Sequence, residues 1–340
     1  MKDLSIVIPA YGKDDPIGLW STIEACIFDL QGSELTYDFR ICSNGVDAPT
    51  ETEKKIEHYL TKAGLVSKWL HTREAQCPAR ARQLLGSDCD SKYMFLFDNH
   101  CLPCHGYFKR GVETMEKYDV DLLHSVTKMF TGYRIDFEYR LTLEKNFWAD
   151  EGYETSKQPT PYKIAAGGHG GIIHRTSTFK EIGGYWEGFN GYGGEEIYYD
   201  LKCWLLGKNV YIDPLFVHAH YAPTERKYQR RSSEGYFLNM LMAANIIGGK
   251  RWLDKVYSKI KNQTVYPSQY EVEIDPNEVI DVENYITEVE NSLISVTQVD
   301  DGYLEKASRL SKEHAAWMAA NRKMTLDELL DYFKREGIRT

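Results

Sequence analysis

Two short, nearly continuous apolar segments that stop at polar residues constrain the fold of this chain more than any other feature. Residues 4–9 read LSIVIP, and residues 93–97 read YMFLF and run directly into Asp98-Asn99-His100. Segments of this length and apolarity are typical of strands buried on both faces, as in a parallel sheet. Because ligands of such sheets bind outside the carboxyl ends of the strands, we expect a functional site where these segments end.

Helix-like and strand-like segments alternate along the first part of the chain. Helical patterns cover residues 16–30, 50–63 and 78–85, and further strand patterns cover residues 37–42 (YDFRIC) and 210–220 (VYIDPLFVHAH). This alternation predicts an α/β fold with a mostly parallel sheet flanked by helices. Tyr11, Asn44 and Asp98 follow three of the predicted strands, so we expect them at one edge of the sheet.

The character of the sequence changes after about residue 264. Residues 271–296 are strongly acidic, and clearer helical patterns cover residues 303–321 and 325–337. The last of these opens with Thr325 and Glu328 in the spacing of a capping box. We therefore predict an α/β domain over residues 1–264 and a helical C-terminal appendage over residues 265–340.

The charge of the chain is negative overall but unevenly distributed. A net charge of −9 over 340 residues argues against a polycation built for nucleic acid. Residues 225–261, however, contain nine lysines and arginines and only three acidic residues. This stretch suits a local anionic ligand, such as a diphosphate or a nucleic acid backbone, or it is simply a solvated helix face.

Cysteine content and the N-terminal segment bear on the compartment. The chain has seven cysteines, an odd number without the spacing of a disulfide framework, which favours reduced thiols. The N-terminal residues lack a signal-peptide pattern, and no apolar run approaches the roughly 18 residues that a membrane span requires. We expect a cytoplasmic protein, in a bacterial or virus-infected host cytosol, with no membrane span.

Two pairs of potential metal ligands lie where predicted strands end. Asp98 and His100 are two residues apart and offer one oxygen and one nitrogen ligand, which suits Mn²⁺ or a similar divalent ion. His218 and His220 are likewise two residues apart at another strand end, and either could face the same ion. An Asp-x-His pair alone is common by chance, but two such sites in one α/β core favour a metal site.

Several segments together resemble a known enzyme family. Arg73-Glu74, Arg80-Ala81-Arg82 and FLFDNHCLPC (residues 95–104) are similar to the donor-site region of the polypeptide N-acetylgalactosaminyltransferases, which are GT-A glycosyltransferases. AAGGHGGIIHR, EIGGYWEGFNGYGGEE and CWLLGKNVYIDP, starting at residues 165, 181 and 203, resemble later segments of that family in the same order. SIVIPAYGKDD, at residues 5–15, resembles the first strand of family-2 glycosyltransferases. The resemblance covers about residues 4–257.

The resemblance implies a fold, a reaction and a set of binding residues. The fold would be GT-A, which is Rossmann-like, with residues 1–264 as the catalytic domain. The reaction would be metal-dependent transfer of a sugar from a UDP-sugar, with Mn²⁺ or Mg²⁺ as cofactor. The implied metal ligands are Asp98, His100 and His220, with the choice between His218 and His220 left open. The implied donor-binding residues are Pro9, Ala10, Tyr11, Asn44, Arg82, Asp98, Gly167, Gly168, Arg226, Lys227, Arg230 and Arg231.

The candidate catalytic residues are two adjacent acids, Glu195 and Glu196. They follow two glycines and open a helical segment, a position that favours ionised carboxylates. In an inverting enzyme one of them would take the proton of the acceptor, with Glu195 preferred from the resemblance; in a retaining enzyme they would position a substrate. The family has Gly-Gly-Glu-Asn here, and this chain also lacks its acidic residues after the second strand and its lectin domain.

These departures leave the acceptor open. The leading hypothesis is transfer to a hydroxyl of a glycan or a protein. A first alternative is transfer to hydroxymethylated bases of DNA, for which the basic stretch beside the predicted site is an argument. A second alternative, from a different class, is a non-catalytic protein that binds nucleotide sugars. The oligomeric state is not predicted.

Overall fold

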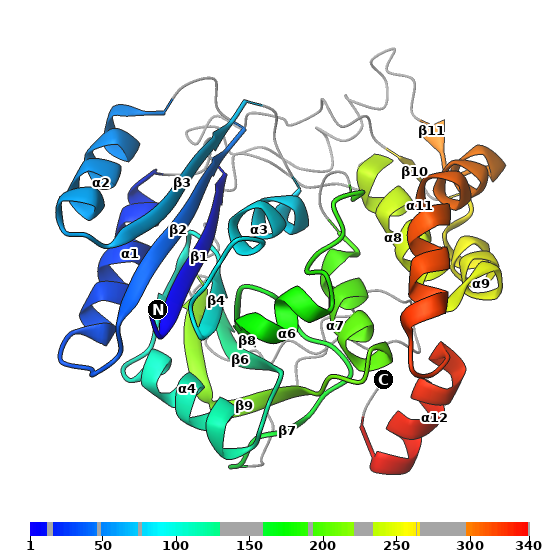
Figure 1. The fold of residues 1–340 in the computed structure, drawn as a ribbon. Helices are drawn as coiled ribbons and strands as arrows, with labels where there is room; N and C mark the ends of the chain where they lie inside the picture. Colours follow the sequence, from blue (N-terminus) through cyan, green and yellow to red (C-terminus); the bar gives the residue numbers. More distant parts are fainter. Residues whose placement is uncertain are drawn as a thin grey trace.

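The computed structural model describes residues 1–11, 16–45, 49–73, 77–129, 159–189, 193–220, 234–262, 264–265 and 297–338. These residues form an α/β fold around one large mixed sheet, with helices on both of its faces (Figure 1). The strands of this sheet are β1 (Leu4–Tyr11), β2 (Tyr37–Asn44), β3 (Val66–Thr72), β4 (Tyr93–Phe97), β5 (Cys101–Pro103), β6 (Leu122–Met129), β7 (Tyr162–Lys163), β8 (Gly171–Arg175) and β9 (Val210–His220).

The strand order is β3-β2-β1-β4-β8-β6-β9-β5, and β7 pairs with β9. Strands β1, β2, β3 and β4 are parallel, and β8 is antiparallel to both β4 and β6. Since β9 is parallel to β6, six of the described strands of this sheet run in one direction, and β5, β7 and β8 oppose them. The predicted α/β class and the mostly parallel sheet are confirmed.

The apolar segments at residues 4–9 and 93–97 lie in the middle of the sheet because both of their faces are covered. Alternate residues of β4 belong to two different hydrophobic clusters: Phe95 and Phe97 to one, Met94 and Leu96 to the other. Side chains of successive strand residues point to opposite faces, so a strand buried on both sides needs apolar residues at every position.

Helices α1 (Pro16–Leu30), α2 (Glu51–Lys62) and α4 (Tyr107–Lys117) contribute to the first of these clusters. Buried side chains of the second cluster come from α3 (Pro78–Gly86), α6 (Thr176–Glu181), α7 (Glu195–Leu205), α8 (Glu234–Gly248) and α9 (Lys250–Ile260). The predicted capping box at Thr325 is present at the start of the last helix, and a second one, formed by Thr50 and Glu53, begins α2.

The C-terminal helices α11 (Asp301–Asn321) and α12 (Leu326–Glu336) pack against α7, α8 and α9. Figure 1 shows them beside these helices, on the side away from α1 and α2. Ala307, Met318 and Phe333 are buried in the same cluster as the residues of α7. Strands β10 (Thr264–Val265) and β11 (Thr297–Gln298) pair where the chain enters this region. The helical character of the C-terminal end is confirmed, and a domain boundary after residue 264 stays a prediction.

Among the described helices, none is both long enough and apolar enough to cross a membrane.

Candidate active site

The carboxyl ends of the central strands bring the expected nucleotide-binding residues together. In the parallel pairing of β1 with β2, Pro9 lies opposite Cys42 and Tyr11 lies opposite Asn44. The Asn44 side chain is buried, and its Oδ1 accepts a hydrogen bond of 3.0 Å from the hydroxyl of Thr72 at the end of β3. The sheet therefore places these residues side by side at one edge, as expected for residues that follow parallel strands.

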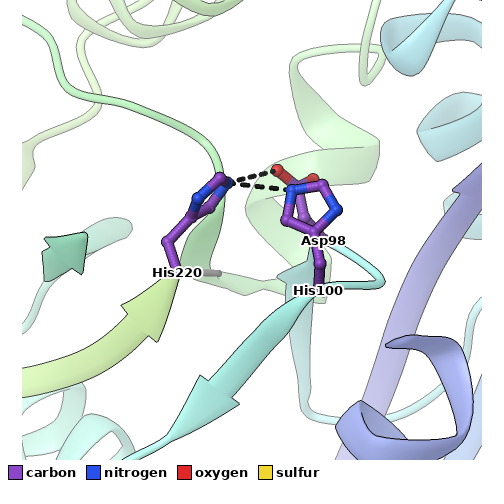
Figure 2. A group of neighbouring side chains, drawn as sticks. All are labelled: Asp98, His100 and His220. Atoms are coloured by element: carbon purple, nitrogen blue, oxygen red, sulfur yellow. Dashed lines mark hydrogen bonds and ion pairs between the residues drawn. The ribbon is translucent and has the colours of Figure 1, made fainter. Parts of the chain in front are cut away.

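Asp98, His100 and His220 converge at the same edge, and we call them the edge cluster (Figure 2). Asp98 follows β4 directly, while His220 ends β9 and lies opposite Cys101 in the antiparallel pairing with β5. His100 Nε2 is 3.0 Å from His220 Nε2, which is 3.8 Å from Asp98 Oδ2. All three side chains are partly exposed, so two imidazoles and one carboxylate are open to a ligand.

Arg82 of α3 contacts Asp98 of the edge cluster from the protein interior and helps to keep its carboxyl group ionised. Its Nη2 donates to Asp98 Oδ1 at 3.0 Å, and only 2% of the Arg82 side chain is exposed. Burial alone would raise the pKa of the Asp98 carboxyl, but the nearby His220 and the charge of Arg82 outweigh burial and hold that pKa far below its usual range. Asp98 is therefore a carboxylate at neutral pH.

His218 occupies a different environment from His220. It is fully buried, its Nδ1 is 2.7 Å from the Ser125 hydroxyl, and its Nε2 is 3.4 Å from Thr127 Oγ1. Burial lowers the pKa of His218 to about 3. The structure thus places His220, and not His218, beside Asp98 and His100. The metal role of these residues remains a proposal.

The glycine-rich segment before β8 runs closely over buried histidines. A side chain at Gly167 would come within 2.6 Å of the His124 ring, and one at Gly171 within 2.7 Å of the His218 ring. The Gly167 N–H donates to Asp200, and the Gly168 carbonyl lies 3.1 Å from His124 Nδ1. The glycines therefore permit close packing of the backbone, and contact of Gly167 and Gly168 with a donor stays a prediction.

His124, His169 and Asp200 form a second group of possible metal ligands, which we call the buried cluster. His124 Nε2 is 3.1 Å from Asp200 Oδ2, and His169 Nε2 is 3.0 Å from Asp200 Oδ1. At most 1% of any of these side chains is exposed. This cluster was not predicted from the sequence, because its members come from β6, the glycine-rich segment and α7, where each stands alone without a pattern.

The acidic pair begins α7, as expected, but its two carboxylates differ. Glu195 is 1% exposed, and its Oε2 accepts a hydrogen bond of 2.7 Å from the Gly193 N–H. Glu196 is more exposed, and its Oε1 accepts a hydrogen bond of 3.1 Å from the His169 N–H. Burial, and then the charge of Glu195, raise the pKa of Glu196 above its usual value. For Glu196 these effects outweigh the helix N-terminus, which alone favours the ionised form.

The predicted basic loop follows β9 in the sequence. Arg226, Lys227, Arg230 and Arg231 lie outside the described residues.

Tyr185, which the sequence did not single out, lies beside the candidate site. Its ring centre is 5.9 Å from the Arg82 guanidinium carbon, and its hydroxyl is 2.6 Å from His169 Nδ1.

No family model matches the sequence, and no curated protein matches it either. Solved structures do match its fold. A crystal structure of GalNAc-T7 with UDP, GalNAc and Mn²⁺ aligns with a TM-score of 0.60 at 15% identity, over 75% of this chain and 50% of that one. S. aureus TarS, residues 1–349 in complex with UDP-GlcNAc, aligns with a TM-score of 0.55 at 12% identity, over 76% of this chain and 71% of that one.

The match thus spans only half the length of the GalNAc-T7 chain. Identities this low establish the architecture and leave activity to be argued from the site. The chain therefore has the GT-A glycosyltransferase fold that its motifs predict.

Proposed function

We propose that this protein is a metal-dependent glycosyltransferase that moves a sugar from a UDP-sugar to a hydroxyl group of a glycan or protein. The observation that carries the proposal is the convergence of Asp98, His100 and His220 beside Arg82 at the carboxyl edge of the sheet. In this fold class, that edge is where ligands bind. The matched structures of GalNAc-T7 and S. aureus TarS contain UDP or UDP-GlcNAc, which supports the choice of donor.

The edge cluster fits a divalent metal ion. Its carboxylate is ionised, its two imidazole Nε2 atoms face each other, and the buried Nδ1 of His220 has no hydrogen-bond partner among the described residues. Two nitrogen ligands and one oxygen ligand suit Mn²⁺ better than Mg²⁺, which prefers oxygen ligands. Asp98, His100 and His220 would hold the ion, which when bound neutralises the charge that develops on the leaving diphosphate.

Arg82 is the described residue best placed to assist on the donor side. Its Nε and Nη1 have no hydrogen-bond partner among the described residues, and its guanidinium is anchored through Nη2. Because these atoms are buried, Arg82 would act through its charge: a fixed cation behind Asp98 stabilises negative charge that develops on the donor side without contacting the diphosphate. We assign Pro9, Ala10, Tyr11 and Asn44 to the nucleoside, and Gly167 and Gly168 to the donor sugar. We assign Arg226, Lys227, Arg230 and Arg231 to the diphosphate.

Glu196 is our candidate for the carboxylate that contacts the acceptor hydroxyl. It is more exposed than Glu195, whose Oε2 is engaged by the Gly193 N–H. The raised pKa of Glu196 makes its carboxylate a stronger base, and general bases work best with a pKa near the operating pH. The resemblance favours Glu195 and the geometry favours Glu196, so both belong in the test.

A panel of nucleotide sugars tests the proposal. Wild-type protein should release UDP from at least one UDP-sugar in the presence of Mn²⁺, and EDTA should abolish this release. Mg²⁺ should support less activity than Mn²⁺ at equal concentration. Turnover that survives EDTA would remove the metal from the proposal, and absence of turnover with every nucleotide sugar, together with absence of UDP binding by calorimetry, would reject the function.

A further inference from the structure

The buried cluster lies next to the candidate active site but has no access to its ligands. Asp200, His124 and His169 are at most 1% exposed, so they cannot touch a donor or an acceptor. Two hydrogen bonds nevertheless converge on the Asp200 carboxylate, from His169 Nε2 at 3.0 Å and from the Gly167 N–H at 2.7 Å, and His124 Nε2 lies 3.1 Å from its Oδ2. A buried carboxylate that is paired this completely is a fixed point of the structure.

The second ring nitrogen of His169 is also engaged. Its Nδ1 is 2.6 Å from the Tyr185 hydroxyl, which donates to it when Nε2 carries the proton that faces Asp200. Burial lowers the pKa of His169 to about 4, in keeping with a neutral ring of this kind. The imidazole is therefore held from both sides, by a carboxylate of α7 and by a tyrosine that follows α6.

The backbone of the same residue reaches the active site in two directions. The His169 N–H donates to Glu196 Oε1 at 3.1 Å, on the proposed acceptor side. The His169 carbonyl accepts from Arg82 Nη2 at 3.1 Å, and that same nitrogen donates to Asp98 at 3.0 Å, on the proposed donor side. The backbone of His169 thus contacts both Glu196, through its N–H, and Arg82, through its carbonyl.

The residues that flank His169 are held through their backbone alone: the Gly167 N–H donates to Asp200, and the Gly170 carbonyl accepts from the Asp98 N–H at 3.1 Å. Gly167, Gly168, Gly170 and Gly171 have no side chains, and glycine loses more backbone freedom on folding than any other residue. The His169 imidazole is the one side chain between these four glycines, so it supplies the side-chain anchoring for the N–H and carbonyl of residue 169.

We propose that His169 is a positioning residue whose imidazole, held by Asp200 and Tyr185, orients Arg82 and Glu196 through its own backbone. The inference rests on the proposed function, because it assigns a task to the surroundings of that same site. His169 contacts no substrate; its effect passes through one carbonyl and one N–H.

Three variants test this role. His169→Leu removes both ring hydrogen bonds, and His169→Gln restores an amide donor toward Asp200. His174→Leu is the matched control, because His174 is equally buried in β8 and neither of its ring nitrogens has a partner among the described residues. UDP release and transfer should be measured for each, with thermal unfolding as the check of folding.

His169→Leu should lower kcat for UDP release about 10- to 100-fold, the range for groups that orient a reactive residue. The KM for the donor should change less, because the ligand-contacting side chains remain. His169→Gln should recover part of the loss, and His174→Leu should stay within about twofold of wild type. Equal kcat values for His169→Leu and wild type, or equal losses in His169→Leu and His174→Leu, would overturn the proposal.

Two further measurements separate this inference from the proposed function. If wild-type protein turns over no nucleotide sugar, crystal structures of the variants still test whether the His169 imidazole positions Arg82. Arg82 should lose its contact with the residue 169 carbonyl in His169→Leu and keep it in His174→Leu, and an unchanged contact in both overturns the proposal.

Metal analysis of the purified protein is the second measurement. A tightly bound ion that persists in His220→Ala but disappears in His169→Gln would make the buried cluster a metal site instead.

Discussion

The edge cluster and the buried cluster each consist of two histidines and one aspartate, but their surroundings differ. In the edge cluster, 26% of the Asp98 side chain and 14% of the His220 side chain are exposed. In the buried cluster, both oxygens of Asp200 are occupied by hydrogen bonds from the protein. The same residue types can therefore bind a ligand in one place and fix the backbone in the other, according to whether their polar atoms are already satisfied.

Different groups stabilise the two carboxylates. Burial opposes ionisation of both, but the pKa of Asp98 is lowered by His220 and Arg82, and the pKa of Asp200 by His124 and His169. Arg82 carries a permanent charge, so Asp98 stays paired whether or not a metal ion is bound. Asp200 depends on two histidines, and all three groups are out of reach of solvent.

The largest difference between the clusters should appear in protein stability. Asp200→Asn should lower the free energy of unfolding by about 3 kcal/mol, because it replaces a buried carboxylate on which several donors converge and leaves at least one of those donors without an acceptor. His100→Ala, in the edge cluster, should cost about 1 kcal/mol or less, because its side chain is partly exposed. Urea denaturation of both variants measures the two values. Equal losses would mean that the clusters share one structural role.

Activity should show the opposite order. His220→Ala should lower the rate of UDP release about a thousandfold and raise the Mn²⁺ concentration needed for half-maximal activity, because it removes a ligand of the ion. His218→Ala is the control two residues away, since it loses the hydrogen bonds to Ser125 and Thr127 but no proposed ligand. Its Mn²⁺ requirement should be unchanged. A shifted Mn²⁺ requirement in His218→Ala alone would transfer the ligand role to His218.

The part of the fold that could be predicted from sequence is the part with a simple hydrophobic pattern. The strand over residues 93–97 and the helix over residues 16–30 were predicted with their observed bounds, because their apolar residues follow one face or fill both. Strand β6 was missed because it carries His124, Ser125 and Thr127 in its interior. His124 Nδ1 and the Ser125 and Thr127 hydroxyls contact residues distant in sequence, which no local pattern can reveal.

The same distinction applies to the site. Asp98 and His220 could be predicted to lie together because each follows an apolar strand, and such strand ends share an edge of the sheet. His169 and Asp200 could not, since nothing local links a glycine-rich segment to the middle of a helix. The signal that was available is the single histidine among glycines at residue 169, and Asp200 four residues after Glu196 on a helix otherwise rich in apolar residues.

The acidic pair begins the helix that also carries Asp200 of the buried cluster, and it gives a smaller expected effect. Glu196→Gln should lower transfer to an acceptor about a hundredfold, as expected for loss of a general base, while UDP-sugar binding stays nearly intact. Glu195→Gln should mainly lower stability, because Glu195 is buried and holds the Gly193 N–H. Transfer kinetics and calorimetry on the same two variants measure both effects. A hundredfold loss of transfer in Glu195→Gln alone would restore Glu195 as the base.

The smallest expected effect is the loss of stability in acid that a fully buried histidine, His174, should cause. Burial lowers the pKa of His174 to about 3, against about 6.5 in an unfolded chain. A histidine with a depressed folded pKa contributes its full stability above the unfolded value, and loses it as the pH falls from 6.5 toward 3, because only the unfolded state then binds the proton. Between pH 7 and pH 5 this single residue should cost the wild-type protein about 2 kcal/mol. His174→Leu removes the titration, so its free energy of unfolding should fall by about 2 kcal/mol less than that of wild type over the same interval. Parallel urea denaturation series at pH 7, 6 and 5 measure the difference, and identical pH dependences would show that His174 is protonated equally in the folded and unfolded states.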